Sequence, residues 1–201
     1  MEELQNIHEK IKDKIEKRLK EFKENGKSNE KMLKELIFCL LTPQSKAKSC
    51  WKAVDTIFKS NEWNEKNLIK KLNGVRFKYK KAKYVIEARN KFNEIKEAMK
   101  EIKEEKEARE WLVKNIKGMG YKEASHFLRN IGKANNLAIL DRHILKNMKT
   151  YGIIDEISKP ITRKKYMMVE KKFIEFAEKN GLLPTHLDFI LWYKETGEVF
   201  K

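Results

Sequence analysis

The feature that most constrains the fold of this chain is a helical hydrophobic repeat that continues through almost its whole length. Only 8 glycines and 3 prolines interrupt 201 residues, and they fall between the periodic segments. In the first segment, Leu4, Ile7, Ile11, Ile15, Leu19 and Phe22 are spaced by three or four residues, as on one face of an α-helix. No stretch alternates polar and apolar residues as a half-buried strand does. The pattern therefore predicts an all-α fold of roughly ten helices.

Breakers and capping residues set the expected limits of these helices. The expected helices are a first one ending near Gly26, a second stopped by Pro43, a third over 45–60, a short fourth ended by Gly74, a long one over 78–99, one over 142–150 ended by Gly152, and a last one after Gly181.

Composition excludes several classes of protein. The longest apolar run, 36–41, is far shorter than the ~20 residues that span a bilayer, and the N-terminus lacks the apolar core of a secretory signal. The two cysteines, Cys39 and Cys50, cannot form a disulfide framework, a four-cysteine iron–sulfur cluster or a cysteine-rich zinc site. We expect both to be buried, reduced thiols in a soluble, intracellular protein, which we take to be a monomer.

The charge is strongly basic. Lys and Arg number 46 against 30 Asp and Glu, a net charge of +16. This balance predicts a polyanionic partner, with nucleic acid favoured over a membrane. An alternative explanation remains, because lysine and glutamate enrichment is also typical of thermophile proteins. Part of the charge would then be a heat-adapted surface.

Residues 111–132 differ from the rest of the chain. Two periodic helices are joined by Gly118-Met119-Gly120, the pattern of a helix-hairpin-helix. Glycines allow such a turn to take a positive φ and to expose backbone N–H groups to a phosphate, so Gly118 and Gly120 are candidate phosphate-binding residues. Met119 should insert into the core. An ordinary tight turn between two helices is the alternative.

Two titratable residues follow the hairpin. Periodicity buries one face of the helix over 121–131 and places Lys122, Ser125, His126 and Arg129 outside the core. Asp141 comes nineteen residues after Lys122 and is one of five aspartates. It should cap the next helix, where the helix N-terminus favours an ionised carboxylate. Such a carboxylate suits a developing cation.

With these residues in place, the chain resembles the helix-hairpin-helix (HhH-GPD) base-excision DNA glycosylases, whose lysine variants are bifunctional glycosylase/AP lyases. The likeness extends to LLTPQSKAKSCWKAV and GVRFKYKKAKYVIEAR, and the C-terminal HLDFILWYKETGEVFK is most similar to the archaeal second type of 8-oxoguanine DNA glycosylase. It implies one unit over 1–201, in two interlocked helical lobes with the active cleft between them. Lobe A would cover about 30–110, and lobe B 1–29 plus 111–201, including the hairpin.

The resemblance also implies a reaction and its residues. The protein would excise 8-oxoguanine from duplex DNA through a lysine Schiff base and β-elimination, with no metal and no cofactor required, although a monovalent cation could bind at the hairpin. Lys122 would be the nucleophile, with a pKa lowered by burial and nearby cations, and Asp141 would stabilise the positive charge that develops on the sugar. The resemblance implies that two further residues bind the DNA, His143 and Gln44. It also implies that three residues recognise the damaged base: Lys201, Trp192 and Phe189. The chain's free C-terminal carboxylate, on Lys201, would accept a hydrogen bond from the lesion's N7–H.

Several alternatives stay open at this point. Arg76 and Lys83 could contact either the DNA backbone or a base. His186 and Asp188 could form a metal pair, although capping of the last helix explains them better. The protein could act on another damaged base, or it could be a non-catalytic helix-hairpin-helix DNA-binding module. A helical scaffold with a heat-adapted surface is the plainest alternative.

Overall fold

The computed structural model describes residues 2–157 and 162–201, and within them the chain forms eleven α-helices and no β-strand. The all-α prediction is confirmed. The helices are α1 (Glu2–Lys27), α2 (Asn29–Leu41), α3 (Ala47–Ser60), α4 (Glu65–Lys71), α5 (Lys78–Asn90), α6 (Phe92–Glu101), α7 (Glu105–Asn115), α8 (Tyr121–Asn130), α9 (Arg142–Thr150), α10 (Arg163–Lys179) and α11 (Pro184–Thr196).

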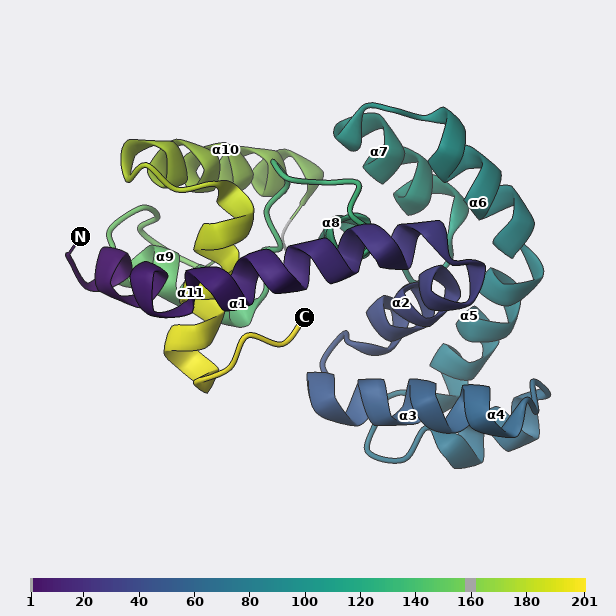
Figure 1. Ribbon diagram of the computed structural model, residues 1–201. Helices are drawn as coiled ribbons and strands as arrows, with labels where there is room; N and C mark the ends of the chain where they lie inside the picture. Colours follow the sequence, from purple (N-terminus) through teal and green to yellow (C-terminus); the bar gives the residue numbers. More distant parts are fainter. Residues whose placement is uncertain (1, 158–161) are drawn as a thin grey trace.

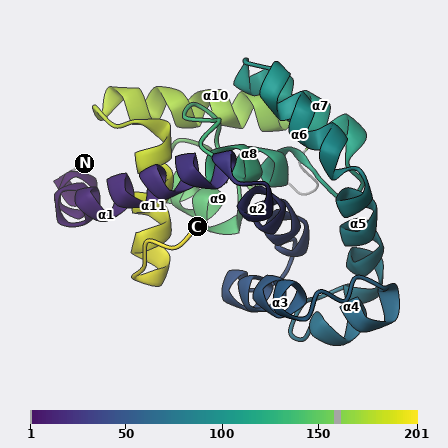
Figure 2. The same cartoon turned by 45° about the vertical axis from the view of Figure 1, so that its right-hand side comes forward.

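The helices surround two hydrophobic cores. The first is built by α2 to α8, and the second by α1, α9, α10 and α11 together with Ala138 and Leu140. Figure 1 shows α2 to α7 on the right, α9 to α11 on the left, and α1 crossing the front from one group to the other. In the turned view of Figure 2, α8 lies between the two groups. α1 therefore contacts both groups, and α8 reaches the second group through the ion pair of Arg129 with Asp188.

The hairpin packs with the first core. The buried side chains of Leu112, Met119 and Phe127 join the apolar residues of α2 and α5, because α8 lies against both α7 and α2. Apolar residues of 111–132 therefore pack with those of 30–110. The division into lobes as such stays a prediction.

The first helix ends near Gly26 as expected, at Lys27, and Gly26 also allows a close approach: a Cβ there would lie 2.2 Å from the carbonyl oxygen of Ile131. One of the expected helices was wrong. The segment expected as one helix over 78–99 is broken at Lys91 into α5 and α6. Lys91 ends α5 and precedes α6, and the buried residues of α6, Ile95 and Met99, join the same core as those of α5.

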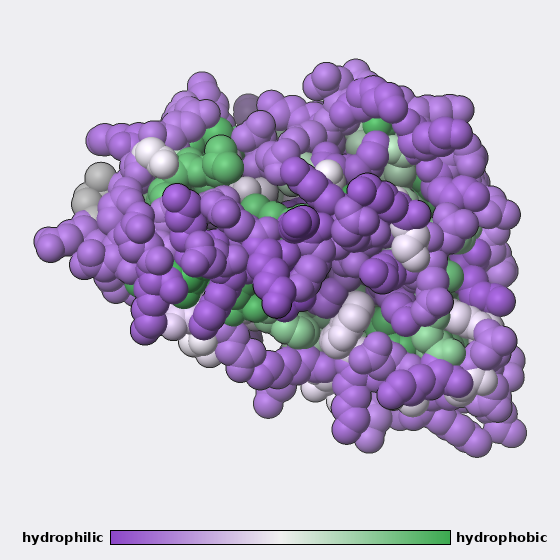
Figure 3. All heavy atoms as spheres, viewed as in Figure 1, coloured by the Kyte–Doolittle hydropathy of each residue, from purple (hydrophilic) through white to green (hydrophobic). Residues whose placement is uncertain are grey.

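The surface is mainly hydrophilic. In the face shown in Figure 3, apolar residues are confined to patches between charged side chains. No helix among the described residues is both long and apolar enough to cross a membrane. Cys39 and Cys50 are buried free thiols, as predicted, and burial raises the pKa of Cys50 to about 11.

Candidate active site

The hairpin turn has the backbone that its glycines predicted. Gly118 has a φ of 83° and Gly120 is the N-cap of α8, while Met119 between them is buried. A Cβ at Gly118 would lie 2.3 Å from the ring of Tyr84 on α5. Both the dihedral angle and the lack of space therefore require glycine at this position.

A hollow of about 550 Å³ lies beside this turn. Its lining includes Gly118, Gly120, three lysines and Glu87, whose carboxylate pairs with two of them; the lysines are Lys91, Lys114 and Lys117. Exposed backbone N–H groups at a helix N-terminus, flanked by lysines, form a site suited to a phosphate.

Lys122, in the first turn of α8, makes two polar contacts. Its Nζ lies 3.0 Å from Oε1 of Glu123 and donates to Oγ1 of Thr42 at 3.3 Å. About a fifth of the side chain is exposed. Burial lowers the pKa of Lys122, but the negative charges of Glu123 and Asp141 outweigh burial and raise it overall. The prediction of a lowered pKa is therefore wrong for this structure, because it did not take Glu123 into account.

Asp141 caps α9 as predicted. Its Oδ1 accepts hydrogen bonds from the backbone N–H groups of His143 at 2.8 Å and Ile144 at 2.9 Å. The carboxylate is close enough to Lys122 to raise the pKa of that lysine. Lys122 belongs to a helix of the first core, and Asp141 starts a helix of the second. The fold thus brings the two predicted residues together where the cores meet.

His143 and Trp192 form one aromatic contact. Their ring centroids are 5.3 Å apart in an edge-on arrangement, and Nδ1 of His143 lies 3.6 Å from Glu195 of α11. Both rings are half-buried, so each retains an accessible edge. Phe189, by contrast, is buried and stacks on Phe22 in the core. It is not placed to stack on a base, and we no longer regard it as a base-recognition residue.

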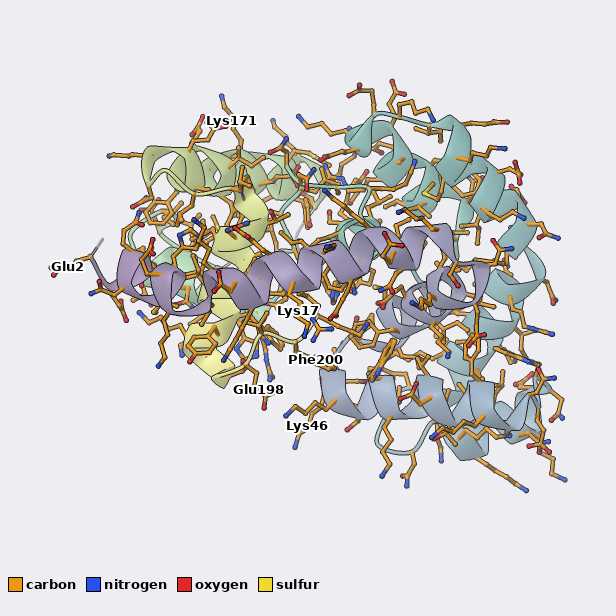
Figure 4. All side chains as sticks on the ribbon, in the orientation of Figure 1. Glu2, Lys17, Lys46, Lys171, Glu198 and Phe200 are labelled. Atoms are coloured by element: carbon orange, nitrogen blue, oxygen red, sulfur yellow. The ribbon has the colours of Figure 1, made fainter. Side chains whose placement is uncertain are left out.

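The C-terminus is fixed against the protein. The Lys201 ammonium pairs with the buried carboxylate of Glu35 and lies 3.6 Å above the centre of the Trp51 ring. Phe200 packs at the edge of the first core. In Figure 4, Phe200 lies below α1, near Lys46 at the start of α3. These contacts hold the side chain of Lys201 at a defined position.

Residues of α8 that were expected outside the core are buried. Ser125, His126 and Arg129 are at most 7% exposed, because α8 lies between the two cores and both of its faces are covered. Arg129 pairs with Asp188 of α11, and burial raises the pKa of Asp188 to about 6. Periodicity indicated the more apolar face of α8 but could not show that its polar face is also covered.

Of the other sequence candidates, Gln44 and Arg76 lie on neighbouring loops, because Oγ of Ser45 accepts a hydrogen bond from the backbone N–H of Arg76. Gln44 is exposed in the turn after α2 and has a φ of 54°. Arg76 and Lys83 are also exposed. His186 contacts His8 instead of Asp188, and no group of three or more metal-ligating residues occurs in 2–157 and 162–201.

Three residues at this site were not found from the sequence. Glu123 directly follows the candidate nucleophile, Thr42 contacts it from α2, and Lys81 lies buried behind Thr42. The acidic residue in the first turn of a helix was the only available signal, and it is common to many helices. The contacts of Thr42 and Lys81 depend on tertiary packing.

Comparison with known proteins extends over the whole chain. Residues 15–182 match a family profile described as 8-oxoguanine DNA glycosylase. An 8-oxoguanine DNA glycosylase/AP lyase of Fusobacterium nucleatum is 44% identical, covering 99% of this chain and 96% of that protein. The crystal structure of the Thermotoga maritima 8-oxoguanine DNA glycosylase has a TM-score of 0.91 and 39% identity, covering 100% of this chain and 97% of that one.

A further solved structure contains DNA. The Methanocaldococcus jannaschii 8-oxoguanine glycosylase/lyase, in complex with a 15mer DNA containing 8-oxoguanine, has a TM-score of 0.92 and 40% identity. The match covers 100% of this chain and 98% of that one.

Proposed function

Because this chain belongs to the 8-oxoguanine DNA glycosylase family, we propose that it is a bifunctional glycosylase/AP lyase that removes 8-oxoguanine from duplex DNA. The observation that supports the proposal is that Lys122, in the first turn after the hairpin, lies near enough to Asp141 for the charge of that carboxylate to raise its pKa. A non-catalytic DNA-binding module would need the hairpin but not this pair.

The proposed reaction begins at C1′ of the damaged nucleotide. As the bond from C1′ to the base breaks, the base leaves with the bonding electrons, and Asp141 stabilises the positive charge on the sugar. The neutral amine of Lys122 forms the new bond to C1′, and opening of the sugar ring gives a Schiff base. Loss of a proton from C2′ then expels the 3′ phosphate and cuts the strand on the 3′ side of the lesion.

The remaining roles in this proposal are those that the family resemblance implies. The duplex docks on the hairpin through Gly118 and Gly120, and His143 contacts a phosphate. The extruded base stacks on Trp192, and the α-carboxylate of Lys201 accepts the N7–H that distinguishes 8-oxoguanine from guanine. Gln44 fills the space left in the duplex. A monovalent cation at the hairpin and a monomeric state stay predictions, as does chemistry without a metal.

Borohydride trapping tests this proposal. The wild-type protein should form a covalent adduct with a duplex containing 8-oxoguanine, and Lys122→Gln should abolish that adduct because the Schiff base requires the amine. The matched control is Lys171→Gln, which removes an exposed lysine of α10 and should trap as the wild type does. Wild-type trapping by Lys122→Gln would assign the nucleophile elsewhere. A panel of other damaged bases tests the substrate.

A further inference from the structure

A buried lysine that the proposed reaction does not use lies behind the turn that follows α2. Lys81 of α5 is 4% exposed. Its Nζ donates to the carbonyl oxygens of Leu41 at 2.6 Å and Pro43 at 2.7 Å, and to Oγ of Ser45 at 3.0 Å. An ammonium has three N–H donors, and here all three have an acceptor in the one turn.

This turn carries a strained residue. Gln44 has a φ of 54°, a left-handed backbone conformation that residues with a Cβ adopt only when their surroundings impose it. The residues on either side of Gln44, Pro43 and Ser45, are the ones that Lys81 binds. Among the described residues, no other side chain donates hydrogen bonds to both neighbours of Gln44.

The same contact joins two loops. Oγ of Ser45 also accepts a hydrogen bond from the backbone N–H of Arg76, at 3.0 Å, in the loop before α5. The loop of Gln44 and the loop of Arg76 are therefore fixed to each other through one hydroxyl group and one buried ammonium. The first loop carries Gln44, which the family resemblance places on DNA, and the second carries Arg76, for which a contact with the DNA backbone or a base was left open.

We propose that Lys81 is a positioning residue, whose buried ammonium holds the turn over 42–45 so that the exposed side chain of Gln44 points into the duplex. This inference rests on the proposed function, because it assigns to Gln44 the filling of the space left by the extruded base. Lys81 itself does not touch DNA. Its effect on the reaction passes through the backbone of Gln44.

A double-mutant cycle between Lys81→Met and Gln44→Ala tests the inference. Single-turnover excision of 8-oxoguanine opposite cytosine should slow about tenfold in Lys81→Met, but less than about twofold further when Gln44→Ala is already present. Trapping on a duplex with a preformed abasic site should change little, because the damaged base no longer has to be extruded. Full additivity of the two excision losses would overturn the proposal.

Lys133→Met is the matched control. The ammonium of Lys133 also donates to carbonyl oxygens at the end of a helix, those of Met99 and Ile102 after α6, but away from the turn of Gln44. The variant Lys133→Met should lower the midpoint of thermal unfolding, as Lys81→Met does, and should leave the excision rate unchanged. Equal slowing by the two variants would show a merely structural role. If the wild type itself does not excise 8-oxoguanine, the proposed function fails, and this is seen before any variant is compared.

A pH profile provides a second test if Lys81→Met does not fold. The pKa of Lys81 is lowered to about 8, chiefly by burial; the charges of Lys122 and Arg76 also lower it, while those of Cys50 and Glu123 oppose this and raise it. Above that pH, a neutral amine has two N–H donors for three acceptors. The titration of Lys122 acts on both proteins alike, so the ratio of the wild-type excision rate to that of Gln44→Ala should fall as the pH rises through this value. A ratio that stays constant with pH would contradict the proposal.

Discussion

At the scale of single residues, the contact between Lys122 and Glu123 determines the resting state of the proposed nucleophile. A lysine must be neutral to attack C1′, yet the carboxylate 3.0 Å away raises the pKa of Lys122 and favours its ammonium form. Glu123 thus opposes the reaction in the free protein. Binding of DNA has to separate or neutralise this pair before the amine can react.

Glu123→Gln should therefore make Lys122 more reactive at neutral pH. Removing the negative charge lowers the pKa of Lys122, and each unit of lowering increases the neutral fraction about tenfold below the pKa. The rate of trapping on a preformed abasic duplex, measured from pH 6 to 10, should rise at lower pH than in the wild type. Glu107→Gln, which removes an exposed charge from α7, is the control. An unchanged profile, or one moved to higher pH, would contradict this account.

At the scale of helices and turns, α5 supports the hairpin through Tyr84. The ring lies where a side chain at Gly118 would begin, so the turn and α5 are packed without intervening space. α5 also carries Lys81, and the loop before it carries Arg76. One helix therefore supports both the phosphate-binding turn and the turn of Gln44.

Gly118→Ala should destabilise the protein and weaken DNA binding together. A positive φ costs alanine about 1 kcal/mol, and the contact with Tyr84 adds to this because the ring or the turn must move. Gly152→Ala is the matched control, since Gly152 also has a positive φ but nothing lies within 4 Å of its Cβ position. Chemical denaturation and DNA titration would compare the two variants. If Gly118→Ala lost no more stability than Gly152→Ala and bound DNA with unchanged affinity, the role assigned to the turn would be contradicted.

At the scale of the whole molecule, a buried ion pair joins the two cores. Arg109 of α7 and Glu170 of α10 form two contacts, at 2.5 and 2.8 Å, and both side chains are at most 4% exposed. Glu170 also accepts the backbone N–H of Ala138, and Tyr166 donates to the carbonyl oxygen of the same residue. The pair thus holds the segment that leads to Asp141.

Glu170→Gln should destabilise the fold by about 3 kcal/mol or more, because it leaves the Arg109 guanidinium buried without its counter-charge. Thermal or chemical unfolding measures this effect. The exposed pair of Lys171 and Glu175 on the same helix provides the control, and Glu175→Gln should leave stability unchanged. A loss no larger than that of the control would show that Arg109 finds another partner.

The sequence by itself determined the helices, the hairpin and the two residues of the proposed chemistry. These follow from local rules: hydrophobic spacing defines helix faces, two glycines define the turn, and Asp141 caps the helix directly after it. The likeness of the hairpin and of the C-terminal segment to one family then indicated the activity.

Only the tertiary structure decided what surrounds these residues. The burial of both faces of α8, the place of Phe189 in the core and the contacts of Lys81 each join segments that are far apart in the chain. Glu123 is adjacent to Lys122, but whether two neighbouring side chains meet depends on the packing around them. The direction of the pKa shift of Lys122 could therefore not be predicted from the sequence, because burial and neighbouring charge act on this pKa in opposite directions.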